Sequence, residues 1–298
     1  MEAGFIGLGR MGAAMVARLV KGKHRIVAYD QDAARVKAVA RRGARGADSL
    51  AHLMQQLRRP HVIWLMVPAG APVATVLRAL ETFLEDGDLV IDAGNYNYRD
   101  SIQRARSLRT QSIHFLDAGT SGGIRGAERG FCLMVGGDPD VFRRAEPLFR
   151  ALATRNSYAL VGPSGAGHFA KMVHNAIEYG MLEAYGEGFE MLAASDFRLD
   201  LRQLARLWNN GSVIRSWLLE LAGDALDKDG RLRKIRGHVE DSGEGRWSVI
   251  EAVERGIPAP ALALALFSRF RSRQKDSFAG KLIAALRQEF GGHKVKGR

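Results

Sequence analysis

The residues best suited to chemistry in this chain lie at helical spacing between positions 165 and 179. The stretch holds no proline and follows the run Gly162-Pro163-Ser164-Gly165, which predicts one long helix that continues to about residue 194. Apolar residues occupy one side of this helix. Four polar residues at i, i+3, i+4 and i+7 share the opposite face: Lys171, His174, Asn175 and Glu178.

An amine and a carboxyl group on one helix face suggest acid–base chemistry. Lys171 and Glu178 are two turns apart, about 10.5 Å along the axis at about 1.5 Å per residue. A small substrate has room to lie between them. The alternative is that this face is only the solvated side of an amphipathic helix.

Composition indicates a globular protein of one large or two ordinary domains. The chain has 298 residues, of which 46% are hydrophobic, and no apolar run approaches the roughly 18 residues of a membrane span. Its one cysteine, Cys132, excludes an internal disulfide and a cysteine-based metal site, so we expect a cytoplasmic protein that holds no metal and binds no membrane. The net charge of +12 is scattered without a basic, aromatic-rich tract. Such a diffuse charge attracts small anions about as well as polyanions, and with no nucleic-acid-binding motif we expect small-molecule and not nucleic-acid partners.

The N-terminal residues carry a dinucleotide-binding pattern. A short apolar strand, residues 3–7, runs into a G-x-G-x-x-G turn and a helix, and a second strand, residues 25–29, ends at Asp30. The first glycine permits the turn, the second lets a pyrophosphate approach, and the third lets helix and strand pack closely. A purely structural turn is the alternative. The candidate cofactor contacts are Gly7, Leu8, Gly9, Arg10, Met11, Gly12 and Asp30.

Asp30 bears on which nicotinamide dinucleotide is bound. A carboxylate here accepts a hydrogen bond from the ribose 2′-OH of NAD and repels the 2′-phosphate of NADP. The following residues bring no basic group before Arg35. We therefore expect NAD to be preferred, with NADP possible.

Strands and helices then alternate, which predicts a doubly wound, mostly parallel Rossmann-like α/β sheet. Two strand ends, at Val67 and Asn95, carry turns where such folds place ligands; Asn95 would equally suit a plain turn. Beyond residue 162 only helical patterns are convincing. We expect a dinucleotide-binding domain in residues 1–162 and an all-helical substrate and oligomerisation domain in residues 163–298.

A glycine-rich segment, residues 118–130, follows the strand that ends near Asp117. Its backbone N–H groups could surround an anion, although a hairpin between two strands would also use glycines. The segment Asp117-Ala118-Gly119-Thr120-Ser121-Gly122-Gly123, the run 132–137 and the stretch 167–180 together closely resemble the decarboxylating 6-phosphogluconate dehydrogenases, in their short-chain branch. This branch belongs to the β-hydroxyacid dehydrogenase superfamily.

The resemblance implies oxidation and decarboxylation of 6-phosphogluconate to ribulose 5-phosphate in the pentose phosphate pathway, by a homodimer or homotetramer. Lys171 would take the hydroxyl proton and later stabilise the enolate, and Glu178 would protonate the carbon that lost CO₂. His174 and Asn175 would orient hydroxyls, and Ser121, Gly122 and Gly123 would hold the carboxylate. Further substrate contacts carried over are Asn95, Tyr179, Arg269 for the phosphate and, from a neighbouring subunit, Arg287 and His293.

One segment departs from the long form of the family, in which a lysine and a threonine contact the phosphate. Ser242 stands in place of the lysine and Glu244 in place of the threonine. Because a carboxylate beside a phosphate is unfavourable, we expect a different phosphate site that uses Arg269 and Arg246. The alternatives are a dehydrogenase for a small unphosphorylated 3-hydroxy acid and a non-catalytic dinucleotide-binding sensor.

Overall fold

The structure, a computed structural model, describes residues 1–296 and divides into two compact units, Met1–His174 and Asn175–Arg298. The boundary falls within the long helix α8 (Ala166–Ala194), which was expected over nearly these residues. None of the described helices is long and apolar enough to cross a membrane.

The first unit is built on one eight-stranded sheet with the order β3-β2-β1-β4-β5-β6-β7-β8. Every neighbouring pair is parallel except β6 and β7, so the expected mostly parallel sheet is confirmed. The strands are β1 (Glu2–Ile6), β2 (Arg25–Tyr29), β3 (Arg45–Gly46), β4 (Val62–Leu65), β5 (Leu89–Asp92), β6 (His114–Ser121), β7 (Phe131–Gly137) and β8 (Ala153–Gly162).

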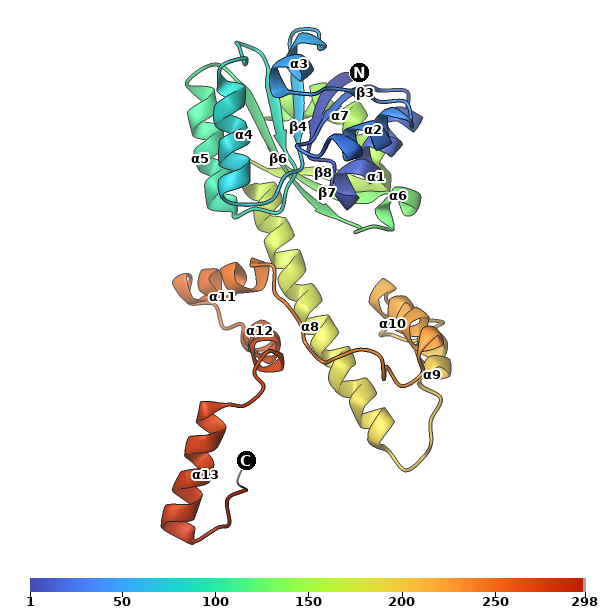
Figure 1. Cartoon of the computed structure of the whole chain (residues 1–298), viewed down its shortest axis with the longest axis vertical. Helices are drawn as coiled ribbons and strands as arrows, with labels where there is room; N and C mark the ends of the chain where they lie inside the picture. The colour runs from blue at the N-terminus through green and yellow to red at the C-terminus, as the bar shows by residue number, and fades with distance from the viewer. Residues whose placement is uncertain (297–298) are drawn as a thin grey trace. The chain divides into compact units, whose positions relative to one another are not determined.

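Helices cover both faces of this sheet (Figure 1). Apolar residues of α1, α2 and α7 pack on one face around Trp64 and Phe149, while those of α3, α4 and α5 pack on the other around Ile63 and Leu65. The helices are α1 (Arg10–Lys21), α2 (Ala33–Ala40), α3 (Leu50–Gln55), α4 (Ala71–Glu81), α5 (Tyr98–Arg109), α6 (Gly126–Arg129) and α7 (Pro139–Leu152).

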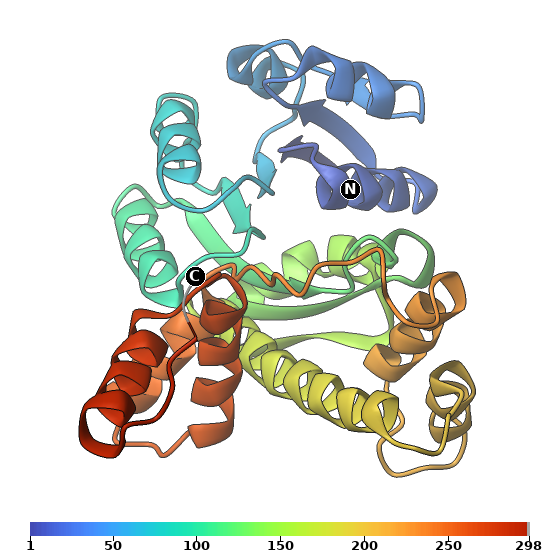
Figure 2. The same ribbon diagram turned by 60° about the horizontal axis from the view of Figure 1, so that its bottom comes forward.

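The described residues of the second unit form helices and connecting loops but no strand, as expected. Tyr185 and Phe189 of α8 belong to a small core with α9 and α10, and Tyr179 belongs to another with α11 and α12. Figures 1 and 2 show α9 and α10 beside the C-terminal part of α8. The helices that follow α8 are α9 (Leu201–Trp208), α10 (Trp217–Lys228), α11 (Glu244–Glu254), α12 (Pro260–Ser272) and α13 (Phe278–Gly291).

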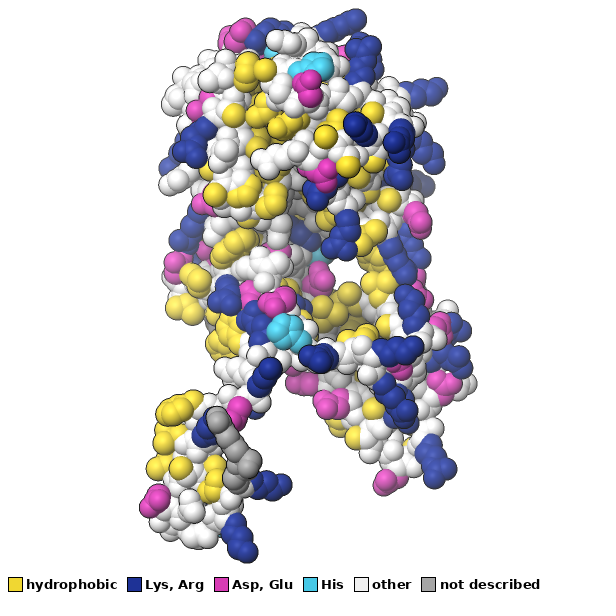
Figure 3. Space-filling view, viewed as in Figure 1, with side chains coloured by type: hydrophobic (Ala, Val, Ile, Leu, Met, Phe, Trp, Pro, Cys, Tyr) yellow, Lys and Arg dark blue, Asp and Glu magenta, His cyan; other side chains and the backbone are white. Residues whose placement is uncertain are grey.

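Helix α13 differs from the others because none of its residues is buried. Apolar side chains nevertheless recur along it and lie open to solvent, as the lower part of Figure 3 shows. Lys and Arg side chains are distributed over the same view, in agreement with their scatter along the sequence. The exposed large apolar residues of α13 are Phe278, Leu282, Ile283, Leu286 and Phe290.

Candidate active site

The glycine-rich turn after β1 has the shape that its residues require. Gly7 has a φ of +98°, and a Cβ at this position would lie 2.3 Å from the carbonyl oxygen of Met66. A Cβ on Gly12 would lie 2.0 Å from the carbonyl oxygen of Gly7, so only glycine lets α1 pack this close. Gly9 has no atom within 4 Å of such a Cβ. Open space therefore lies beside the N-terminus of α1, where Arg10 and Met11 begin the helix.

Asp30 is tied to this turn. Its Oδ2 accepts the N–H of Leu8 at 2.6 Å, and its Oδ1 accepts the N–H of Asp32 at 2.9 Å. Arg35 lies 3.6 Å from Asp30 and 3.3 Å from Asp32, so two carboxylates surround the first basic group of this segment. A 2′-phosphate would meet negative charge here, whereas a 2′-OH would find acceptors.

The strand order reverses between β1 and β4, which is where open α/β sheets bind their ligands. Val67 follows β4, and its Cγ1 would lie 3.0 Å from a Cβ on Gly7. The hydroxyl of Tyr96 donates to the carbonyl oxygen of Val67 at 2.7 Å. Asn95 is the exposed residue just before Tyr96. The two predicted strand-end residues, Val67 and Asn95, are thus linked through Tyr96 near the glycine-rich turn.

Lys171 is packed closely against the segment that follows Asp117. A Cβ on Gly119 would lie only 2.4 Å from the Cβ of Lys171 and 2.6 Å from the carbonyl oxygen of Gly167. A Cβ on Gly167 would lie 2.5 Å from the carbonyl oxygen of Met134. Glycines on both partners therefore let α8 lie on β6 and β7 with the lysine beside the glycine-rich segment.

The fully buried carboxylate of Asp117 fixes the start of α8. Its Oδ1 accepts the N–H of Gly165 at 2.6 Å, and its Oδ2 accepts the N–H of His168 at 2.8 Å. These N–H groups lie at the helix N-terminus, where intrahelical partners are missing and a negative charge is favourable. This role of Asp117 could not be predicted, because the two donors lie 48 and 51 residues from the acceptor along the chain. One turn separates His168 from Lys171.

Further buried polar groups support His168. Its Nδ1 lies 2.6 Å from the hydroxyl of Ser101, and its ring meets that of Tyr96 edge-on. Burial lowers the pKa of His168 to about 4, so the ring is neutral near pH 7. Burial raises the pKa of Asp92 to about 7, although the ion pair with Arg104, at 3.0 Å, opposes the shift.

The glycine-rich segment joins the antiparallel strands β6 and β7, so it does make the strand connection considered above. Gly122 and Gly123 have φ values of +129° and +53°, which favour glycine. The hydroxyl of Ser121 lies 3.3 Å from Nε2 of His174. The structure thus brings together Ser121, His174 and, by its packing on Gly119, Lys171.

In the second unit, Asn175 and Tyr179 lie one turn apart on α8 and contact the start of α11. The Nδ2 of Asn175 donates to Oε1 of Glu244 at 2.8 Å. The hydroxyl of Tyr179 accepts the N–H of Ser242 at 3.3 Å, and a Cβ on Gly245 would lie 2.7 Å from the Tyr179 ring. Glu178, in the same turn of α8, is partly buried.

Arg269 lies over the ring of Tyr179. Its guanidinium lies 3.5 Å from the centre of the tyrosine ring, and its NH1 donates to the carbonyl oxygen of Glu240 at 2.8 Å. Arg246, the second arginine expected at the phosphate, instead makes a two-bond ion pair with Asp241 at 2.8 and 3.1 Å. Arg269 is therefore the stronger candidate for an anion.

The two predicted tail residues lie at the end of α13. The backbone N–H of His293 donates to the carbonyl oxygen of Arg287 at 3.5 Å, and Gly292 ends the helix with a φ of +62°. Both side chains are exposed. Within residues 1–296, no hydrogen bond or ion pair joins either side chain to Arg269 or Tyr179.

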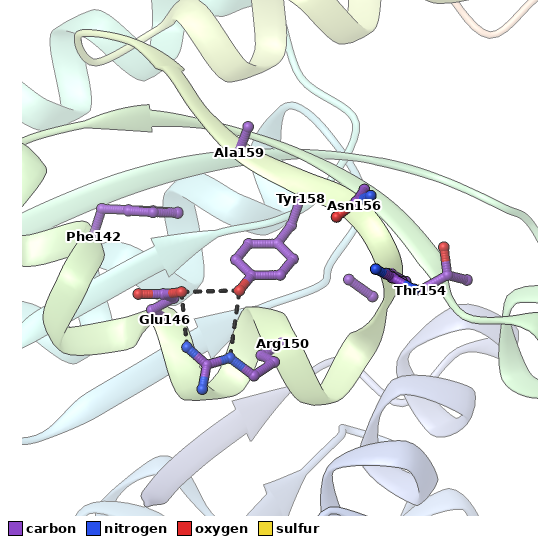
Figure 4. A pocket seen from close by; sticks show the side chains of 9 residues that line it. Phe142, Glu146, Arg150, Thr154, Asn156, Tyr158 and Ala159 are labelled. Atoms are coloured by element: carbon purple, nitrogen blue, oxygen red, sulfur yellow. Dashed lines mark hydrogen bonds and ion pairs between the residues drawn. The ribbon is translucent and has the colours of Figure 1, made fainter.

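A cavity of about 550 Å³ lies between α7 and β8 (Figure 4). There the hydroxyl of Tyr158 donates to Glu146 at 2.9 Å, and Arg150 pairs with the same carboxylate. None of the predicted site residues lines it. In the described part of the chain, no group of three or more His, Cys, Asp or Glu could hold a metal ion.

Comparison with known protein families matches nearly the whole chain. Residues 2–162 match the NAD binding domain of 6-phosphogluconate dehydrogenase, and residues 167–295 match the C-terminal domain of the same enzyme. The chain belongs to the 6-phosphogluconate dehydrogenase family. The resemblance drawn from the sequence is confirmed, and the glycine-rich turn and Asp30 lie in a domain of the NAD-binding kind.

Relatives of this 6-phosphogluconate dehydrogenase family member include both short and long chains. This chain is 46% identical over 297 residues to the NAD⁺-dependent, decarboxylating 6-phosphogluconate dehydrogenase of Haloferax volcanii, and the match covers 99% of this chain and 98% of that one. The Plasmodium falciparum 6-phosphogluconate dehydrogenase structure matches with a TM-score of 0.84 at 26% identity, over 100% of this chain and 66% of that chain. The 3-hydroxyisobutyrate dehydrogenase of Mycobacterium tuberculosis shares the fold, with a TM-score of 0.72 at 23% identity over 96% and 99% of the two chains.

Proposed function

We propose that this protein oxidises and decarboxylates 6-phosphogluconate to ribulose 5-phosphate and CO₂, with reduction of NAD⁺, as a step of the pentose phosphate pathway. Its near full-length similarity to an NAD⁺-dependent, decarboxylating relative supports this activity. The observation that carries the proposal is the close packing of the Lys171 Cβ and Cγ on Gly119, at the start of the glycine-rich segment.

Lys171 is the base in this reaction. It takes the proton of the substrate hydroxyl, and the bound nicotinamide accepts the hydride from the same carbon. As an ammonium ion, Lys171 then faces the new carbonyl and stabilises the enolate that forms when CO₂ leaves. Glu178 follows two turns later on the same helix and gives a proton to the carbon that lost the carboxylate.

The remaining contacts sort by substrate group. Ser121, Gly122 and Gly123 hold the carboxylate, as suits a hydroxyl and backbone N–H groups. His174, Asn175 and Asn95 orient the hydroxyls. Arg269 binds the phosphate, for which its planar fork of N–H donors is suited. The ring of Tyr179 packs against the guanidinium.

Two tail residues complete the site from a second copy of the chain. A helix without a buried residue is unstable alone, because tertiary packing supplies most helix stability in proteins. The apolar residues of α13 therefore favour a homodimer or homotetramer in which α13 is covered. In this assembly Arg287 and His293 reach the phosphorylated substrate of the neighbouring subunit.

The cofactor preference rests on Asp30. The residues at the end of β2 fit the adenosine ribose of NAD, because Asp30 offers a carboxylate to the ribose hydroxyls. Arg35 forms ion pairs with both Asp30 and Asp32. NAD is therefore preferred over NADP. The domain boundary near residue 162 and a cytoplasmic location stay predictions.

The test is the rise in absorbance at 340 nm with 6-phosphogluconate and either NAD or NADP. Unphosphorylated gluconate and 3-hydroxyisobutyrate are run beside it. We expect turnover of 6-phosphogluconate alone, with the larger kcat/KM for NAD. Turnover of an unphosphorylated acid instead would favour the 3-hydroxy acid dehydrogenase, and no turnover at all would favour a sensor.

A further inference from the structure

Glu244 is the buried acid of the helical unit that contacts the proposed substrate-binding face of α8. Its side chain is 2% exposed, and its Oε1 accepts a hydrogen bond from Nδ2 of Asn175 at 2.8 Å. The carboxylate that replaces the threonine of the long form is thus hydrogen-bonded to an amide proposed to bind a substrate hydroxyl.

The sequence around Glu244 fixes this position. Gly243 precedes α11 with a φ of +105°, and Gly245 leaves room for the ring of Tyr179, as a Cβ there would lie 2.7 Å from it. The N–H of Ser242 also bonds the hydroxyl of Tyr179. The segment from 242 to 245 is therefore held against α8, which brings the first side chain of α11 to Asn175, one turn before Tyr179.

We propose that Glu244 is a positioning residue that sets the orientation of the Asn175 amide. This inference rests on the proposed function. An ionised carboxylate only accepts hydrogen bonds, so a rotated amide would bring Oδ1 against Oε1 and lose the bond. When Nδ2 of Asn175 is bonded to Glu244, Oδ1 of the same amide is left to accept a hydrogen bond from a substrate hydroxyl. Because Oδ1 has two lone pairs, it can accept this bond in addition to any other that it makes.

The long form of the family has threonine at this position. A threonine hydroxyl both donates and accepts, and its side chain is shorter, so it would not select one orientation of the amide. In this chain the residue serves the hydroxyl end of the substrate instead of its phosphate.

A double-mutant cycle tests the inference. Glu244→Thr and Asn175→Ala are made singly and together in the full-length protein, and kcat/KM for 6-phosphogluconate is measured with the KM for NAD. We expect Glu244→Thr to lower kcat/KM about 30-fold when Asn175 is present and less than about 2-fold when it is alanine, at unchanged KM for NAD. Glu244→Gln keeps the length of the side chain but can donate as well as accept, so we expect it to lower kcat/KM too, by less than Glu244→Thr because its carbonyl still reaches Asn175.

Two further variants make the result decisive. Glu251 is a buried acid of the same helix, and it pairs with Arg255 at 2.5 Å. Glu251→Ala therefore measures how much kcat/KM falls when a buried carboxylate of α11 is lost. We expect this fall to be equal with asparagine and with alanine at position 175. Glu244→Asp keeps the charge at the start of α11 but withdraws it from Asn175, and it replaces the threonine variant if that one does not fold.

Equal losses on Glu244→Thr in both backgrounds would overturn the inference, as would wild-type kcat/KM in Glu244→Thr or in Asn175→Ala. A wild-type protein that fails to oxidise 6-phosphogluconate would instead overturn the proposed function, because this rate is read before any variant is compared.

Discussion

Helices α8 and α13 both carry residues proposed to act on the substrate, and they are held in opposite ways. The start of α8 lies on β6 and β7, with glycines at its contacts and its first N–H groups on the buried Asp117. Helix α13 has no buried residue, and Phe290 near its end is 78% exposed. Lys171 thus lies on a helix that is packed against its own chain. Arg287 lies on a helix that has no buried residue.

This difference separates two kinds of requirement. A base must be placed within a fraction of an ångström of the proton that it takes, which demands a rigid support. A phosphate contact made by a long arginine tolerates more freedom. We therefore expect changes at α8 to lower kcat at any protein concentration and changes at α13 to act through assembly.

The largest effect is expected for Lys171→Met, which removes the base and leaves the packing of α8 in place. Because general base catalysis contributes 10²–10⁴-fold, kcat should fall by about 10³-fold. NAD binding, followed by fluorescence titration, should be unchanged. Wild-type turnover in this variant would remove Lys171 from the mechanism.

Asp117→Asn tests the support of α8. One of the two acceptors becomes an NH₂ group facing an N–H, so we expect a loss of about 2 kcal/mol in the free energy of unfolding and a fall in kcat of about 10-fold. Asp138 caps α7 in a similar way, by accepting from the N–H groups of Asp140 and Val141. Asp138→Asn should cost at most about 1 kcal/mol and leave kcat unchanged.

Leu286→Asp tests the dependence of α13 on a second copy. The side chain is exposed within the chain, so its charge should not unfold the monomer, but it should weaken self-association about 30-fold if the face is buried in the assembly. Sedimentation and the concentration dependence of specific activity measure this. Gln288→Asp adds the same charge on the same helix as a control. Unchanged assembly in Leu286→Asp would leave α13 outside the interface.

The smallest effect concerns the pH dependence of stability near the start of α8. Between about pH 4 and 6.5, His168 binds more protons in the unfolded chain, so its contribution to stability rises with pH. Asp92 has its pKa raised in the folded state, so its contribution falls over about pH 4–7 and opposes that of His168. Because Asp92→Asn removes the opposing group, the free energy of unfolding of this variant should rise by about 2 kcal/mol between pH 4 and pH 6.5, owing to His168. Urea unfolding measures this. A flat profile in the variant would contradict these assignments.

Much of the first unit could be predicted because its strands are short apolar runs and its glycines fall at fixed spacing. The strand at residues 25–29 has the expected bounds. Strand β8 was missed because it lies at the sheet edge, where Thr154, Arg155 and Asn156 face solvent and break the apolar pattern. Helix α7 had a usable signal in Asp138 and Pro139, its cap and first residue.

The polar face of α8 could also be predicted, since helical spacing alone brings Lys171 and Asn175 to one side. The residues that support them could not. Asp117 reaches α8 across about 50 residues and Glu244 across 69, and no local pattern records such pairings. The sequence indicated only that Glu244 is unsuited to a phosphate contact, and it did not predict the hydrogen bond from Asn175.

The central claim is that the reaction couples oxidation to decarboxylation, and the most direct test measures NADH and CO₂ together. Purified protein is given limiting 6-phosphogluconate with excess NAD, and both products are followed to completion. The proposed function predicts one CO₂ for each NADH. NADH without CO₂, or no NADH from this substrate, would contradict it.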